Sequence, residues 1–186
     1  MPDDDARMDP GKTALKLAAR LRRLDPGPLA ALRRMDADGA APAYWHLAAS
    51  HENLFRRPEV WVPVVRALAM LTSKGPPEER DDLHDATRRL GAALCDGGDP
   101  DWPSGGTPRP MLSERRLAQL LAARGAGRAV LLTRAVRALA AKKPAHAGVH
   151  VPDLAWAFIG TKPQKIAEPY YRRLDRAERA ASKEET

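Results

Sequence analysis

The sequence predicts an all-α fold, a two-lobed helical bundle of about eight or nine helices with no significant sheet. Alanine and leucine dominate the apolar residues and aromatic residues make up only 5% of the chain, which favours helices over strands. Every periodic apolar segment repeats at roughly 3.6 residues, and none alternates at two. A chain of 186 residues is long enough to bury a core, as one domain or as two small lobes.

Changes in composition divide the chain into five parts. Acidic or Gly/Pro/Asp-rich stretches of low hydrophobicity are typical of disordered ends and surface loops, whereas apolar residues at helical spacing mark the lobes. The expected parts are a disordered acidic N-terminus at 1–10, an N-terminal helical lobe at 11–95, a flexible loop at 96–110, a C-terminal helical lobe at 111–181 and a solvated tail at 182–186.

Five helices are expected in the N-terminal lobe. Pro28 suits the first turn of its helix, because the N–H that proline lacks has no partner there. Pro63 lies early enough in the longest of these helices to be tolerated. The expected helices cover about 11–24, 28–35, 42–49, a longer stretch after Pro58 to about 71, and 81–95.

The C-terminal lobe is expected to begin with a helical hairpin. Ser113 is the predicted N-cap of its first helix, because the hydroxyl can accept from the free N–H groups of the first turn. Gly125 and Gly127 are expected to stop this helix, and the second helix is expected to start near Arg128. The expected inward residues are Leu117, Leu120, Leu121, Leu132, Ala135, Val136 and Leu139. Two further helices are expected at 153–159, capped by Asp153, and at 164–181.

The hairpin region, residues 110–143, accounts for the net charge of the chain. It carries eight basic residues and one acidic residue, Glu114, and therefore a net charge of +7. The whole chain is also +7, so the remaining 23 basic and 23 acidic residues balance. Six of the eight basic residues are arginine, whose planar fork suits phosphate oxygens. The sequence therefore favours a surface that binds a phosphate backbone over an ordinary solvated helix face.

Basic residues also gather in adjacent pairs at the starts or ends of the expected helices. Such pairs occur at 33–34, 56–57, 115–116 and 142–143. Arg124 does not fit this pattern, since it projects onto the apolar face; it either extends past the helix end or marks an interface. The candidate nucleic-acid-binding residues are Arg33, Arg34, Arg56, Arg57, Arg115, Arg116, Arg124, Arg134, Arg137, Lys142 and Lys143.

Several classes of function find no support in the sequence. No phosphate-binding loop, dinucleotide fingerprint or HExxH motif is present, and a single cysteine, Cys95, excludes an internal disulfide and a cysteine zinc site. We therefore expect no cofactor, no metal and no catalytic residues. No apolar run approaches the roughly 18 residues of a membrane span, and acidic residues follow Met1, the reverse of a signal peptide. A cytoplasmic protein is expected.

Four stretches of the chain, taken in order, resemble the CasB family, the small subunit of the type I-E CRISPR surveillance complex Cascade. The central stretch, 112–121, reads LSERRLAQLL and resembles the family's signature. The stretch 27–34 resembles a G-x-x-A-x-L-R-R element, and 42–45 resembles a proline-aromatic element. The stretch 153–156, followed by two tyrosines at 170–171, resembles the C-terminal half of the family.

The resemblance implies an all-α, two-lobed fold without a catalytic site. It implies two copies of the protein in Cascade, beside the crRNA-bearing backbone subunits and with the large subunit as a further partner. These copies would hold the target strand and the displaced non-target strand of the R-loop. Arg33, Arg34, Arg115 and Arg116 match the basic pairs of the family's motifs. The other candidate residues come from local charge alone.

Two alternatives of other classes remain at this stage. One is a stand-alone helical DNA-binding regulator, although the hairpin lacks a clear recognition helix with base-reading Asn or Gln. Strong sequence-specific binding by the isolated protein would favour it. The other is a helical enzyme with a divergent site, which reproducible turnover or a bound metal would support.

Overall fold

The computed structural model describes residues 9–36, 41–103, 107–160 and 162–184. Over these ranges the chain forms ten α-helices and no strand, with one isolated parallel bridge between His84 and Val149. The all-α prediction is therefore confirmed. The helices are α1 (Pro10–Arg22), α2 (Pro26–Arg34), α3 (Pro42–Ala48), α4 (Glu52–Arg56), α5 (Pro58–Leu71), α6 (Leu90–Asp96), α7 (Glu114–Ala122), α8 (Gly125–Lys142), α9 (Val151–Ile159) and α10 (Gln164–Glu184), with a 3-10 turn at Pro77–Glu79.

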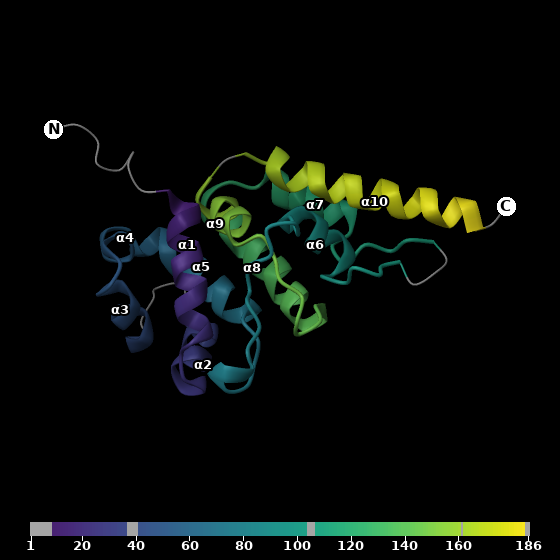
Figure 1. The fold of residues 1–186 in the computed structure, drawn as a ribbon. Coiled ribbons are helices and arrows are strands. Elements are labelled where there is room, and N and C mark those ends of the chain that lie inside the picture. The colour runs from purple at the N-terminus through teal and green to yellow at the C-terminus, as the bar shows by residue number, and fades with distance from the viewer. Residues whose placement is uncertain (1–8, 37–40, 104–106, 161, 185–186) are drawn as a thin grey trace.

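Helix α5 lies in the middle of the core. It contacts α1, α2, α4, α8 and α9, and these helices surround it in Figure 1. Its sequence is apolar on nearly every side, as expected for a helix buried by several neighbours. Pro58 occupies its first turn, and Pro63 lies inside the helix, which continues to Leu71. The predicted tolerance of Pro63 is therefore confirmed.

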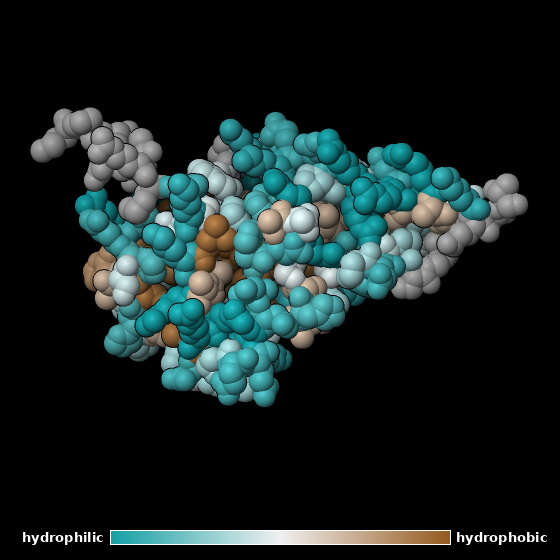
Figure 2. All heavy atoms as spheres, viewed as in Figure 1, coloured by the Kyte–Doolittle hydropathy of each residue, from teal (hydrophilic) through white to brown (hydrophobic). Residues whose placement is uncertain are grey.

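Helix α10 packs along α6 and then extends beyond the rest of the molecule, so that the C-terminal end lies at one extremity in Figure 1. The two backbones meet at Gly91. A Cβ atom on Gly91 would lie 2.0 Å from the carbonyl oxygen of Ile166 and 3.0 Å from the amide nitrogen of Tyr170. Hydrophilic residues cover the length of α10 and most of the face in Figure 2, with apolar residues exposed in small groups. No helix of the described ranges is long and apolar enough to cross a bilayer.

The predicted helix at 81–95 is wrong over most of its length, because only Leu90–Asp96 is helical. The preceding segment is extended and pairs with the segment before α9. Val149 donates to the carbonyl of Leu83 at 2.8 Å, and Asp85 donates from its amide to the carbonyl of Val149 at 3.1 Å. The Asp85 carboxylate also accepts from the amide and hydroxyl of Thr87, a local turn that competes with a helix. Long-range pairing and this turn together override the helical spacing of the leucines.

Three predicted helix ends also differ in the structure. Ser113 stands at the N-cap position of α7, but its side chain makes no capping hydrogen bond. Helix α7 ends at Ala122, before either glycine, and α8 already begins at Gly125, which adopts a positive φ of 52°. The two glycines therefore lie in the first turn of α8 and do not form the end of α7. Helix α9 is capped by His150, whereas Asp153 accepts from the amide of Leu90 and thus caps α6.

The ends and boundaries of the predicted parts fall as follows. Residues 1–8 of the predicted disordered terminus lie outside the described residues, and α1 begins at Pro10 with the Asp9 carboxylate accepting from the amide of Gly11 at 2.9 Å. Helix α10 continues to Glu184, into the predicted tail. Contacts of α1 with α9 and of α5 with α8 join residues on both sides of the predicted loop. The division into two lobes stays a prediction.

The close approach of α6 and α10 gives a direct test. We expect Gly91→Ala to lower the free energy of unfolding by about 1–3 kcal/mol or more, because its methyl group meets fixed backbone atoms. Thermal unfolding measures the change. Gly27→Ala is the matched control, since a Cβ there has no atom within 4 Å. Equal melting temperatures for the two variants would contradict this packing.

Candidate nucleic-acid interface

The two helices of the predicted basic hairpin lie in contact and present most of their cations to solvent. In α7, Leu117 and Leu120 are buried, while Arg115 and Arg116 are exposed. The single carboxylate of the hairpin, Glu114, accepts a hydrogen bond from Tyr171 of α10. Burial and the charge of Glu114 raise the pKa of that tyrosine. Arg115 and Arg116 are therefore not neutralised by their neighbour.

Helix α8 contains no acidic residue over its 18 residues. The predicted inward residues Leu132, Ala135, Val136 and Leu139 are all buried. The helix thereby turns Arg134, Arg137 and Lys142 to the surface, where all three are exposed. Since like charges on one helix repel each other, this arrangement lowers stability unless an anion lies against it.

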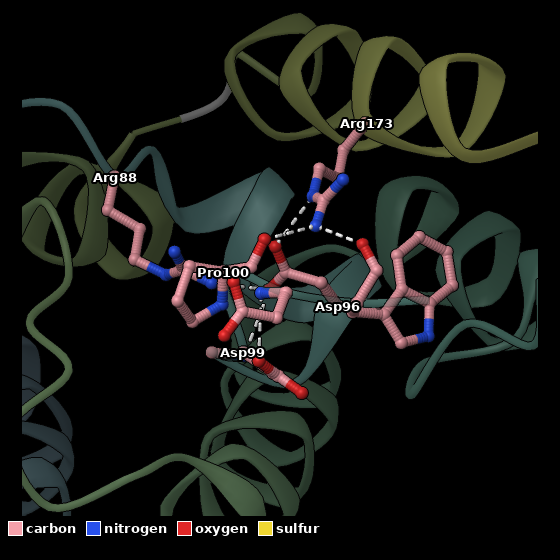
Figure 3. Close-up of polar contacts among 8 residues, drawn as sticks. Arg88, Asp96, Asp99, Pro100 and Arg173 are labelled. Atoms are coloured by element: carbon pink, nitrogen blue, oxygen red, sulfur yellow. Dashed lines mark hydrogen bonds and ion pairs between the residues drawn. The ribbon is translucent and has the colours of Figure 1, made fainter. Parts of the chain in front are cut away.

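The C-terminal end of α8 is fixed by a buried charge cluster centred on Asp96. The Asp96 carboxylate, whose side chain is 2% exposed, pairs with Arg88 at 3.0 Å and with Arg173 at 2.8 Å, and the two guanidinium groups approach from different sides (Figure 3). The turn that follows, Gly97–Gly98, packs directly on α8, because a Cβ on Gly98 would lie 2.6 Å from the Cβ of Lys143. The cluster therefore holds the turn against the basic end of α8.

Three of the predicted binding residues use their side chains to bind backbone carbonyls. Arg33 donates to the carbonyls of Ala69, Thr72 and Ser73, and so caps the C-terminal end of α5. Burial, and then the charge of Arg80, lower its pKa. The result is a structural role for the guanidinium of Arg33, whereas Arg34 beside it is exposed.

Arg124 caps α7 in the same way. Its guanidinium donates to the carbonyls of Leu121, Ala122 and Ala123 at 2.9–3.1 Å, which explains why its position did not fit the polar face. Lys143 donates to the carbonyls of Pro144, Ala145 and Ala147, and burial lowers its pKa. The Arg124 contacts satisfy carbonyls that the end of α7 leaves without partners, whereas the Lys143 contacts fix the segment that follows α8.

The pair Arg56–Arg57 is exposed but has acidic neighbours. Arg56 forms an ion pair with Glu52 one turn earlier, and Arg57 lies 4.0 Å from Glu59. Exposed pairs of this kind contribute little stability, but they reduce the local positive potential. Among the predicted binding residues, six side chains have no hydrogen bond or ion pair to a described residue: Arg34, Arg115, Arg116, Arg134, Arg137 and Lys142.

A further row of cations on α1 was missed from the sequence. Lys12, Lys16 and Arg20 follow one another at intervals of four residues and are all exposed, so they form a single stripe along the helix. None of the three makes a side-chain hydrogen bond or ion pair to a described residue. The spacing of four residues is a signal in the sequence that predicts this stripe, whereas the net charge of the chain, which residues 110–143 alone account for, does not indicate it.

The pKa of His51 responds to the positive charges of this stripe. Burial, followed by the charges of Lys16 and Arg20, lowers the pKa of His51 from 6.5. The folded state therefore favours neutral His51, and this contribution to stability is present above pH 6.5 and is lost as the pH falls towards the folded-state pKa.

We expect Lys16→Gln to raise the pKa of His51, although burial should keep that pKa below the ordinary value. Titration of the histidine ring by NMR measures the shift. Lys12→Gln removes a charge from the same stripe but not one that acts on His51, and it should leave the pKa unchanged. An unchanged pKa in Lys16→Gln would show that the stripe does not reach His51.

The family model for the CRISPR-associated protein Cse2 matches residues 28–181, from α2 to near the end of α10. Cse2 is the small subunit of type I-E Cascade, also called CasB, so the resemblance found in the sequence is confirmed. Neither a curated protein nor a solved structure matches the chain significantly. The match spans well over half of the 186 residues, and the chain therefore belongs to the Cse2 family of CRISPR Cascade subunits.

Proposed function

We propose that this protein is a non-catalytic subunit that stabilises the R-loop of Cascade by holding the target strand and the displaced strand through contacts of arginine and lysine with phosphate. The observation that carries the proposal is the set of exposed, unpaired cations on two helices in contact, α7 and α8, with no carboxylate on α8. Phosphate oxygens are the anions that such a surface fits best.

The structure separates the candidate residues by the partners of their side chains. Arg33, Arg124 and Lys143 bind backbone carbonyls, so we assign Arg33 and Arg124 the task of fixing helix ends and Lys143 that of fixing the segment after α8. The phosphate contacts are assigned to the predicted binding residues that have no hydrogen bond or ion pair to a described residue, and to the stripe on α1. These are Arg34, Arg115, Arg116, Arg134, Arg137 and Lys142, together with the α1 stripe of Lys12, Lys16 and Arg20.

The chemistry of this surface suits a role that does not require base readout. Arginine and lysine on helix faces bind backbones by charge, which positions a strand but carries no sequence information. In RNA-guided recognition the guide RNA reads the target sequence through base pairing, and the protein binds the strands by their shape and backbone charge. The backbone and large subunits, crRNA, target DNA and a second copy of the chain are the partners this function requires, in the cytoplasm.

Charge reversal on α7 tests the phosphate contacts in the free protein. We expect wild-type protein to bind single- and double-stranded DNA with little sequence preference, and its log affinity to fall steeply with log salt concentration. Replacing both Arg115 and Arg116 by Glu should lower that slope by about two units, roughly one for each lost contact. Titrations at several salt concentrations measure the slope.

The matched control reverses two exposed arginines on α10, Arg172 and Arg176, and changes the net charge by the same amount. It should change the slope much less, because its charges lie outside the proposed surface. Equal losses in the two double variants would mean that only net charge matters. Equal affinity of the wild type at low and high salt would contradict the phosphate contacts altogether.

A further inference from the structure

A small pocket lies where α9 turns into α10, and none of its lining residues is among those assigned to phosphate above. Its volume is about 230 Å³, and Trp156, Gly160, Lys162 and Lys165 are among its lining residues. The Trp156 side chain is 38% exposed, an unusual position for a large aromatic ring. The Lys165 ammonium lies 6.0 Å from the ring centroid. The pocket thus combines an open aromatic face with two lysines.

Gly160 gives the pocket its shape. The amide of Gly160 donates to the carbonyl of Trp156 at 2.7 Å, which ends α9 and turns the chain back over the indole ring. A Cβ on Gly160 would lie 2.8 Å from that carbonyl oxygen and 3.3 Å from a ring carbon of Trp156. Only a residue without a side chain fits so close to the ring, and the turn brings the following lysines to the pocket.

The pocket is also positively charged. Lys162 and Lys165 are exposed and form no ion pair with a described residue. The one carboxylate in the lining, Asp153, is buried, is paired with Arg89 at 2.7 Å and accepts from the amide of Leu90. It is therefore unavailable to the lysines. Arg128, which donates to the carbonyl of the lining residue Ala157, adds a buried cation nearby.

We propose that this pocket binds one nucleotide of a single-stranded nucleic acid, with the base stacked on Trp156 and a phosphate held by Lys162 and Lys165. The proposal rests on the proposed function, because it assigns a particular strand element to the same protein. The volume is below the roughly 300–1,000 Å³ of pockets that take whole small molecules, and it suits a single planar base. Aromatic rings stack with every base, and lysine is a common partner of phosphate.

The contact between Lys165 and Trp156 is compatible with this occupant. A separation of 6.0 Å lies at the outer limit of about 6 Å for a cation–π interaction, so the contact is weak. A base that enters the pocket displaces the ammonium from the ring. The ammonium is then free to pair with the phosphate of the same nucleotide, and the loss of the weak contact costs little.

A comparison of normal and abasic single strands separates stacking from charge. We expect Trp156→Ala in the full chain to weaken binding of a thymidine oligonucleotide roughly 5- to 150-fold, the range that corresponds to loss of one stacked base. Its affinity for an abasic strand of equal length should stay unchanged. Trp156→Phe should keep most of the affinity for thymidine. Lys162→Gln with Lys165→Gln should weaken binding of both strands, and fluorescence anisotropy measures each of these affinities against that of wild type.

Trp45→Ala is the control, because Trp45 is 40% exposed on α3 and its ring has no cation–π contact with a described lysine. It should leave the preference for thymidine over the abasic strand unchanged. The pocket proposal is overturned if Trp156→Ala binds thymidine as tightly as wild type, if Trp45→Ala has an equal effect, or if Trp156→Ala disturbs only assembly with protein subunits. If the wild-type protein binds neither strand at low salt, the proposed function fails as well.

Discussion

The carboxylate of Asp96 neutralises two arginines that come from different parts of the chain. Arg88 precedes α6 and Arg173 lies on α10, 77 positions further along from Asp96 itself. Arg173 also donates to the carbonyls of Pro100 and Trp102 and lies over the Trp102 ring. Removal of the carboxylate would leave two largely buried cations unpaired, which would lower the free energy of unfolding by about 3–5 kcal/mol. The position of α10 and the path of the chain after α6 both depend on this cluster.

The proposed surface depends on the same cluster through packing. Asp96 fixes the turn Gly97–Gly98, which lies against Lys142 and Lys143 at the end of α8. Arginine also serves as a structural residue elsewhere. Arg80 is 1% exposed and donates to the carbonyls of Gly75, Leu21, Arg22 and Leu24, so it ties the segment after α5 to the end of α1. Several arginines therefore have structural tasks in this fold, and the proposed function assigns phosphate only to exposed arginines and lysines without a hydrogen bond or ion pair to a described residue.

The helices could be predicted from sequence where local spacing decides the structure. Leu117 and Leu120 fall on the buried face of α7 as expected, and the apolar residues of α8 do the same. The prediction of a helix at 81–95 was wrong over most of its length because this segment pairs with residues near Val149, a contact that no local pattern encodes. Arg33 belongs to a basic pair that matches a family motif, but the carbonyls that its guanidinium binds lie 36 to 40 positions away, and no local spacing encodes these contacts. The stripe on α1 was accessible from its four-residue spacing.

The central claim is that exposed cations on α7 and α8 hold strands of the R-loop. The most direct measurement is the lifetime of the R-loop in assembled Cascade that carries either wild-type subunit or the Arg115→Glu, Arg116→Glu variant, after equal incorporation and equal thermal stability of the subunit are established. The account predicts a shorter lifetime with unchanged guide-pairing rules, since repulsion replaces two phosphate contacts while the heteroduplex still sets the sequence. An R-loop that lasts as long with the variant as with wild type would contradict it.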